Sequence, residues 1–310
     1  MPRASALLLA LCLLAAGCGG SGSSHRSAPP PARGPFAFDP SQPFAFVDRG
    51  RVNRKYPIRV DDVSYASGQD SVSGYLVRPP KTHKRLPAVV FLHGAGGDRS
   101  ELLVPATWIA ARGAIALTIT APSSVAQPSH GGSATYQLRR DVKLTESDVV
   151  AVRRAIELLR RRPDVDPARV GFVGWSAGAR TGAILSGVQR DLPAIVLMSA
   201  GAVPVGIYAH ASPKSLRPTI TKELTLVDPL RYVERARGRD LMLQDGRNDQ
   251  VVPHSALLEL LKAAPPGTTV RWYDANHPLN AAAYRDQLAF LAHRLGVSGP
   301  VVNGAETGPS

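Results

Sequence analysis

A serine near the middle of the chain, Ser176, lies in a Gly-x-Ser-x-Gly turn. The short apolar run 170–173 leads into this turn, and small residues that can begin a helix follow it. A tight strand-to-helix turn of this kind lifts the serine hydroxyl above a sheet, and its glycines leave room where side chains would clash. The pattern predicts that Ser176 is a nucleophile. Because an unassisted serine is a poor nucleophile, this prediction also requires a base and an acid elsewhere in the chain.

Asp249 and His277 are the candidates for that acid and that base. Each follows a separate apolar run that has the composition of a buried strand. The imidazole of His277 would take the proton of the serine, and the carboxylate of Asp249 would fix the tautomer of the imidazole and stabilise its charged form. Asp245 is a rival for the acid, but it lies nearer the end of its strand and before the turn residue Gly246, as expected for an aspartate that caps its own loop.

The segment 93–97, His-Gly-Ala-Gly-Gly, follows another apolar run and offers small residues with free backbone amides. Two such amides would stabilise the oxyanion of a tetrahedral intermediate, and the loss of one typically costs about 3 kcal/mol. The predicted donors are the amides of Ala95 and Ala177, with Gly96 as an alternative to Ala95. His93 precedes these donors, and we expect it to be structural rather than catalytic.

The elements that must position these residues alternate between strands and helices. Short apolar runs without alternation predict strands buried on both faces, at 88–92, 114–119, 170–173, 194–198, 241–243 and 270–273. Helical spacing of apolar residues predicts helices at 148–161, 255–263 and 281–295. This alternation predicts an α/β fold with a mostly parallel central sheet and helices on both faces. The strand expected near 73–80 would add an antiparallel edge.

Two long connections, 121–144 and 201–228, interrupt this pattern. Long irregular connections in compact domains tend to be functional loops, so we expect these two segments to overhang the active site as short lid-like loops. They are the segments expected to determine the choice of substrate.

Over roughly residues 56–295 the chain resembles the dienelactone-hydrolase-like and prolyl-oligopeptidase-like branch of the α/β-hydrolases. The motifs that carry the resemblance are Asp166-Pro167-Ala168-Arg169-Val170 before the elbow, the His93-Gly94 loop, Asp228-Pro229 and the Gly246-x-x-Asp249 turn. The resemblance implies an α/β-hydrolase fold and a serine hydrolase whose triad follows the chain order Ser176, Asp249, His277.

The sequence departs from this branch in three respects. Dienelactone hydrolases use a cysteine nucleophile, so the serine at position 176 argues against that particular reaction. The chain has no segment long enough for the β-propeller of the related peptidases. Ala179 follows Gly178 where members of the branch often have a second glycine.

The amino-terminal residues 1–17 have the layout of a signal peptide, with a basic Arg3 and an apolar run over 6–16. Small residues then lead into Cys18, and this arrangement resembles a bacterial lipobox in which Cys18 is lipidated. The alternative is an ordinary signal-peptidase site beside an incidental cysteine. We expect export to a bacterial cell envelope, with the protein anchored in the membrane through a lipid on Cys18.

The sequence predicts one catalytic domain between two irregular segments. Its expected divisions are a flexible Gly/Ser/Pro-rich linker over 18–35, the domain over 36–297 and a disordered tail over 298–310.

The composition excludes several other kinds of site. The formal net charge is +13, but the basic residues are scattered and no nucleic-acid-binding motif accompanies them, so no nucleic-acid partner is expected. The two cysteines, Cys12 and Cys18, both precede the domain, which leaves it without a cysteine nucleophile or thiolate metal ligand. His130, His210 and His254 lack the spacing of metal ligands, so neither a metal nor a cofactor is expected.

These observations favour a serine hydrolase that cleaves a carboxylic ester through an acyl-enzyme on Ser176. The same triad would also serve an amidase or peptidase. A non-catalytic, surface-tethered binding protein on a hydrolase scaffold is a third interpretation, because fold alone does not imply function. The expected substrate is a small-molecule or polymeric ester, and neither the acyl preference nor the oligomeric state follows from the sequence.

Overall fold

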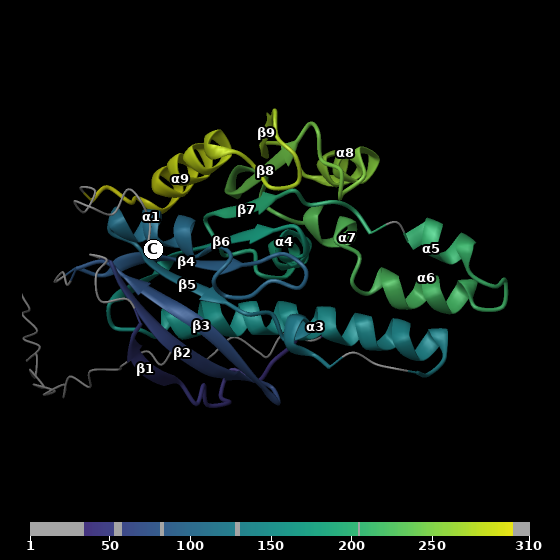
Figure 1. The fold of residues 1–310 in the computed structure, drawn as a ribbon, viewed down its shortest axis with the longest axis horizontal. Coiled ribbons are helices and arrows are strands. Elements are labelled where there is room, and N and C mark those ends of the chain that lie inside the picture. Colours follow the sequence, from purple (N-terminus) through teal and green to yellow (C-terminus); the bar gives the residue numbers. More distant parts are fainter. Residues whose placement is uncertain (1–33, 53–57, 81–83, 128–130, 204, 300–310) are drawn as a thin grey trace, which may run out of the picture. The chain divides into compact units, whose positions relative to one another are not determined.

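A nine-stranded sheet forms the centre of the protein in a computed structural model, which describes residues 34–52, 58–80, 84–127, 131–203 and 205–299 (Figure 1). The spatial order of its strands is β1-β2-β3-β5-β4-β6-β7-β8-β9. Their bounds are β1 Val47–Arg51, β2 Arg59–Ser67, β3 Asp70–Arg78, β4 Leu86–Leu92, β5 Ile115–Ile119, β6 Val165–Trp175, β7 Ile195–Met198, β8 Leu241–Gly246 and β9 Thr269–Tyr273.

The sheet is parallel from β5 to β9, whereas β1, β2 and β3 pair antiparallel and β3 joins β5 antiparallel. All five residues of β5 and six of the seven residues of β4 are buried. Strands buried on both faces contain continuous apolar runs because neither face contacts water. The predicted mostly parallel sheet with an antiparallel amino-terminal edge is therefore confirmed.

Helices cover both faces of the sheet. Their bounds are α1 Leu103–Ala111, α2 Pro122–Val125, α3 Ala134–Arg160, α4 Ala177–Val188, α5 Val205–Ala211, α6 Arg217–Thr225, α7 Leu230–Val233, α8 His254–Ala263 and α9 Ala281–Leu295. Apolar residues of α1 and α9 pack in one core cluster, and apolar residues of α3, α4, α7 and α8 pack in another. The two clusters lie on opposite faces, because neighbouring residues of β4 belong to different clusters.

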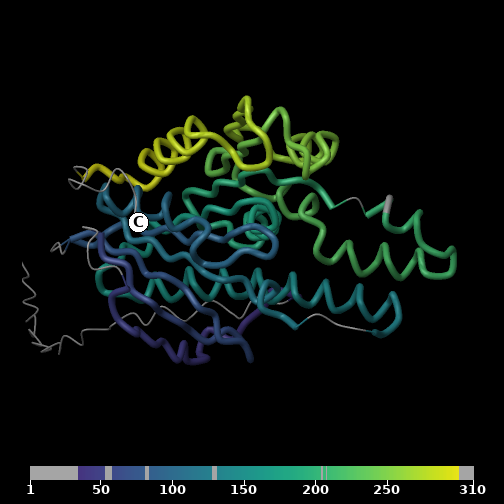
Figure 2. The backbone as a smooth tube through the Cα atoms, viewed as in Figure 1, coloured from purple at the N-terminus to yellow at the C-terminus, as the bar shows by residue number. Residues whose placement is uncertain are grey.

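Helix α3 begins at Ala134, fourteen residues before the predicted start at residue 148. The prediction was wrong because the apolar stripe marks only the part of the helix that packs on the sheet. The amino-terminal part of α3 lies beside α6 rather than on the sheet (Figure 2). It therefore does not need the continuous apolar stripe that packing on the sheet requires. The hydroxyl of Ser133 accepts the N–H of Tyr136 and caps this start.

The two long connections therefore contain more helix than predicted. The segment 121–144 includes α2 and the beginning of α3, and the segment 201–228 includes α5 and α6. Helices α2, α5 and α6 have only four, seven and nine residues, which is too short for a clear apolar periodicity, so the pattern did not reveal them.

Residues 1–33 and 300–310 lie outside the described residues. The signal peptide, the lipidated Cys18, nearly all of the linker and most of the tail therefore stay predictions. Within the described ranges, no helix combines the length and apolarity that a membrane crossing requires.

A buried arginine on α3 connects three parts of the chain. The guanidinium of Arg154 donates hydrogen bonds to the backbone carbonyls of Gln42, Pro43 and Ala66, at 2.9–3.3 Å. It also lies 4.2 Å from the ring centroid of Phe44. The side chain of Arg154 is fully buried, so its guanidinium depends on these carbonyls as hydrogen-bond acceptors. Arg154 thus fastens the segment before β1, and the end of β2, to the longest helix.

Replacing this arginine by methionine, R154M, should lower the free energy of unfolding by about 3 kcal/mol, because the hydrogen bonds from one charged donor to three separate carbonyls are lost together. Urea denaturation followed by circular dichroism measures the change. The matched control is R139Q, which removes an exposed ion pair with Glu223 and should cost less than about 1 kcal/mol. Equal losses in the two variants would contradict the structural role of Arg154.

Candidate active site

Ser176 occupies the sharp turn between β6 and α4. Its backbone has φ 52° and ψ −114°, a conformation that is strained for a residue with a side chain. The N–H of Ser176 donates to the carbonyl of Met198 at 2.8 Å, which ties the turn to the end of β7.

The glycines on either side of Ser176 are required by close backbone contacts. A Cβ atom at Gly174 would lie 2.3 Å from the carbonyl oxygen of Gly178, across the turn. A Cβ atom at Gly178 would lie 2.3 Å from the carbonyl oxygen of Leu92, at the end of β4. The Gly-x-Ser-x-Gly pattern therefore reflects a turn that closes on itself and on the neighbouring strand.

The structure brings Ser176, His277 and Asp249 together from three separate strand ends. The Nε2 atom of His277 lies 2.8 Å from the Oγ atom of Ser176, and its Nδ1 atom lies 2.8 Å from Oδ2 of Asp249. The side chains of His277 and Asp249 are only 8% and 1% exposed. This arrangement can carry a proton from the serine to the imidazole while the carboxylate stabilises the resulting charge.

The second carboxylate oxygen of Asp249 is occupied by its own loop. Oδ1 accepts the backbone N–H groups of Val251 and Val252, at 2.8 and 2.9 Å. One oxygen therefore orients the carboxylate, and the other faces the imidazole.

The backbone of His277 is held by two side chains whose part in the site the sequence analysis missed. The carbonyl oxygen of His277 accepts the indole N–H of Trp175 at 3.2 Å and the hydroxyl of Ser199 at 2.9 Å. Ser199 is fully buried and has a φ of 52°. Its only signal in the sequence is a position directly after an apolar run, which many residues share.

Asp245, the rival acid, lies in β8 and does not contact the imidazole. Its carboxylate is buried and accepts the backbone N–H of Ala200. Burial and the nearby charge of Asp249 raise the pKa of Asp245 to about 7. The geometry therefore favours Asp249 as the partner of His277.

The predicted oxyanion donors line a cavity beside the serine. Ala177 is the first residue of α4, so its N–H has no acceptor within the helix. Ala95 and Gly96 both border the same cavity, and both remain candidates for the second donor. The loop that carries them is fixed by Glu101, whose carboxylate accepts the N–H of Gly94 at 2.8 Å.

His93 has a structural role, as expected from the sequence. Its Nε2 atom accepts the N–H of Ala121 at 2.9 Å, and its Nδ1 atom lies 2.6 Å from the carbonyl oxygen of Gly94. Both ring nitrogens thus connect backbone segments, and the side chain is buried.

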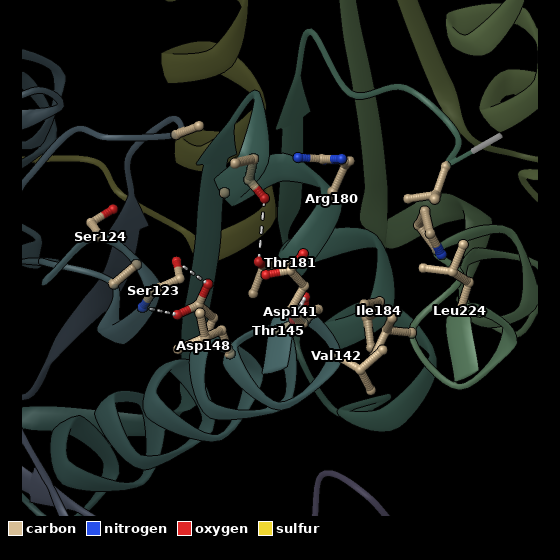
Figure 3. A pocket seen from close by; sticks show the side chains of 18 of the residues that line it. Ser123, Ser124, Asp141, Val142, Thr145, Asp148, Arg180, Thr181, Ile184 and Leu224 are labelled. Carbon is tan, nitrogen blue, oxygen red and sulfur yellow. Dashed lines mark hydrogen bonds between the residues drawn. The ribbon is translucent and has the colours of Figure 1, made fainter. Parts of the chain in front are cut away.

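The cavity has a volume of about 720 Å³, and Figure 3 shows part of its lining. His277 does not line it. Its walls come from the loop after β4, the amino-terminal part of α3, the first two turns of α4 and the segment 203–229. The two long connections predicted to overhang the site contribute to these walls, together with the helices that they contain. Within the described residues, no group of three or more His, Cys, Asp or Glu side chains is placed to hold a metal ion.

One family model matches part of the chain. Residues 152–255 match the family described as BAAT / Acyl-CoA thioester hydrolase C terminal, a stretch that contains Ser176 and Asp249 and ends before His277. No curated protein matches the chain.

Solved structures match over most of the chain. An acetyl xylan esterase from Paenibacillus sp. R4 has a TM-score of 0.67 and 19% identity, over 82% of this chain and 90% of its own. Acetyl xylan esterase 1 from Thermoanaerobacterium sp. JW/SL YS485 has a TM-score of 0.64 and 16% identity, over 82% of this chain and 89% of its own. A putative dienelactone hydrolase from Klebsiella pneumoniae subsp. pneumoniae MGH 78578 has a TM-score of 0.57 and 15% identity, over 77% of this chain and 98% of its own.

At these identities the likeness shows the fold. The strand order, the elbow between β6 and α4 and the structural matches agree with one another. The chain has an α/β-hydrolase fold, and the solved structures that share this fold include a putative dienelactone hydrolase.

Proposed function

We propose that the protein hydrolyses carboxylic esters through an acyl-enzyme intermediate on Ser176. The observation that carries this proposal is the continuous hydrogen-bonded chain from the Ser176 hydroxyl through His277 to Asp249. The names of the structural relatives, which include acetyl xylan esterases, support an ester as the substrate.

Acylation begins when Oγ of Ser176 attacks the ester carbonyl carbon and Nε2 of His277 takes the hydroxyl proton. The negative charge moves to the carbonyl oxygen, where the amides of Ala177 and of Ala95 or Gly96 stabilise it. As the tetrahedral intermediate collapses, His277 gives the proton to the departing alkoxide, which leaves as the alcohol. Asp249 keeps Nδ1 of the imidazole protonated throughout.

Deacylation repeats these steps with water as the nucleophile. His277 takes a proton from water, the hydroxide attacks the acyl carbon, and the same amides hold the second oxyanion. The proton then returns to Oγ of Ser176, which releases the carboxylic acid. The carbonyl contacts from Trp175 and Ser199 serve both half-reactions because they hold the backbone of the base in place.

The proposal also includes export and lipid anchoring at Cys18, which rest on the amino-terminal sequence alone. The linker over 18–35 would then let the domain reach small-molecule or polymeric esters at the surface of the envelope.

The substitution S176A should reduce the hydrolysis of 4-nitrophenyl acetate by about four to six orders of magnitude, because it removes the hydroxyl that forms the acyl-enzyme. Release of nitrophenoxide measures the rate, and intact mass after fluorophosphonate treatment shows whether Ser176 is modified. The matched control is S147A on α3, which should keep wild-type activity. If S176A retained wild-type turnover, the proposed nucleophile would be wrong.

The two aspartates should differ in their effect on turnover. D249N should lower kcat by about 10⁴-fold, because an amide no longer fixes the imidazole tautomer. D245N should lower kcat by less than about tenfold, since Asp245 does not contact the imidazole. Steady-state kinetics on the same ester compares them, and a larger loss in D245N would reverse the assignment of the acid.

Asp245 should make stability depend on pH. Its folded pKa of about 7 lies above the ordinary value near 3.8, so the unfolded chain releases this proton first as pH rises. The contribution of Asp245 therefore lowers the stability of the wild type between about pH 4 and pH 7, and D245N lacks this contribution.

The free energy of unfolding of D245N relative to wild type should rise by roughly 4 kcal/mol between pH 4 and pH 8. Urea denaturation at several pH values measures this difference. A difference that stayed constant over the range would show that burial does not raise the pKa of Asp245.

A further inference from the structure

An arginine one helical turn beyond the nucleophile faces the cavity. Arg180 is the fourth residue of α4, and its backbone N–H donates to the carbonyl of Ser176 at 3.0 Å. One turn of helix corresponds to a rise of about 5.4 Å, so the side chain begins close to the reacting serine. Figure 3 shows the side chain of Arg180 on the cavity wall, and it is exposed rather than packed in the core.

The guanidinium of Arg180 has no carboxylate partner among the described residues. Arg99 and Arg139, by contrast, form ion pairs with Asp62 and Glu223. Removal from water by the surrounding protein atoms lowers the pKa of Arg180. The phenol of Tyr208, another residue of the cavity wall, acts in the opposite direction and raises it. Because the guanidinium is exposed at the cavity wall and forms no ion pair with a described residue there, an anionic ligand in the cavity would gain a charge-assisted hydrogen bond from it.

Two aspartates also line the cavity, but neither neutralises this arginine. The carboxylate of Asp148 accepts the backbone N–H and the hydroxyl of Ser123, at 2.9 and 2.6 Å. Asp141 is exposed on α3, which forms a different wall from α4. The guanidinium of Arg180 is therefore available to a ligand in the cavity.

The position of the cavity identifies which half of the ester it receives. His277 must give its proton to the leaving oxygen, so the alcohol half lies on the side of His277. The walls of the cavity are formed by residues between Leu92 and Pro229, including the oxyanion candidates Ala95 and Ala177, and not by His277. The acyl half, on the opposite side of the carbonyl carbon, thus points into the cavity.

We infer that the cavity binds an acyl group that carries a carboxylate, with the guanidinium of Arg180 as its receptor. This inference rests on the proposed esterase function and names the substrate class: monoesters of dicarboxylic acids. Arginine suits this role because its planar fork can donate two parallel hydrogen bonds to one carboxylate.

Three aryl esters with the same six-carbon acyl chain test this inference: mono-4-nitrophenyl adipate, 4-nitrophenyl hexanoate and 4-nitrophenyl 6-aminohexanoate. Their chain ends are negative, neutral and positive at pH 7.5. Shorter dicarboxylates are avoided because their free carboxylate would attack its own ester. The wild type should show the highest kcat/KM on the adipate ester, about tenfold to a hundredfold above hexanoate.

R180Q should remove this preference by lowering kcat/KM on adipate about tenfold to a hundredfold while leaving hexanoate within about threefold. R180K, which keeps the charge but not the fork, should fall between R180Q and wild type. The matched control is R190Q, an equal charge change on an exposed residue just past the end of α4, which should keep the preference. Fluorophosphonate labelling of Ser176 confirms that each variant is folded.

Three results would overturn the inference. They are a wild type with no preference for adipate, a preference for the aminohexanoate ester, and equal losses on adipate and hexanoate in R180Q. If the wild type hydrolysed hexanoate through Ser176 without preferring adipate, only this inference would be lost. If it hydrolysed none of the three esters and Ser176 resisted the probe, the proposed function would be lost with it.

Discussion

The close approach of the first turn of α4 to the end of β4 is the constraint on which the candidate site depends. It is possible only because Gly178 has no side chain, since a Cβ there would overlap the carbonyl oxygen of Leu92. Beside this contact lie the strained backbone of Ser176 and Ala177, which lines the cavity. The nucleophile, one oxyanion donor and the arginine one turn later all belong to the same rigid helix start, so their spacing does not depend on loop conformation.

The rest of the site is brought to this helix start by the parallel sheet. The carboxyl ends of β6, β7 and β8, and the loop after β9, lie at one edge, and each contributes one component. Residues 101 positions apart in the chain thus come within hydrogen-bond distance, as Ser176 and His277 do. The carbonyl of His277 is held by residues from two different strand ends, which gives the base a fixed backbone as well as a fixed ring.

The sequence predicted the sheet, its antiparallel edge and the residues that meet at its carboxyl end, because buried strands and close backbone contacts restrict residue type strongly. Gly174 and Gly178 illustrate this restriction, since no other residue fits. A residue whose role depends on its neighbours in the folded structure is not restricted in type in this way, so the sequence alone did not identify it. Ser199 became part of the site only through the folded position of His277, and Arg180 resembled any polar residue of a surface helix. The early start of α3 was missed because that part of the helix packs on a helix rather than on the sheet.

The amino-terminal part of α3 and the α5–α6 segment form the outer walls of the cavity, whereas the reacting groups belong to the sheet edge. Apart from Arg180, which lies on α4, the recognition part of the polypeptide is thus separate from the part that carries out catalysis. Evolution can remodel the recognition part by insertion or substitution without disturbing proton transfer. Divergence of specificity in this architecture should therefore concentrate between β5 and the middle of α3, and between β7 and α7, while the sheet edge stays constant.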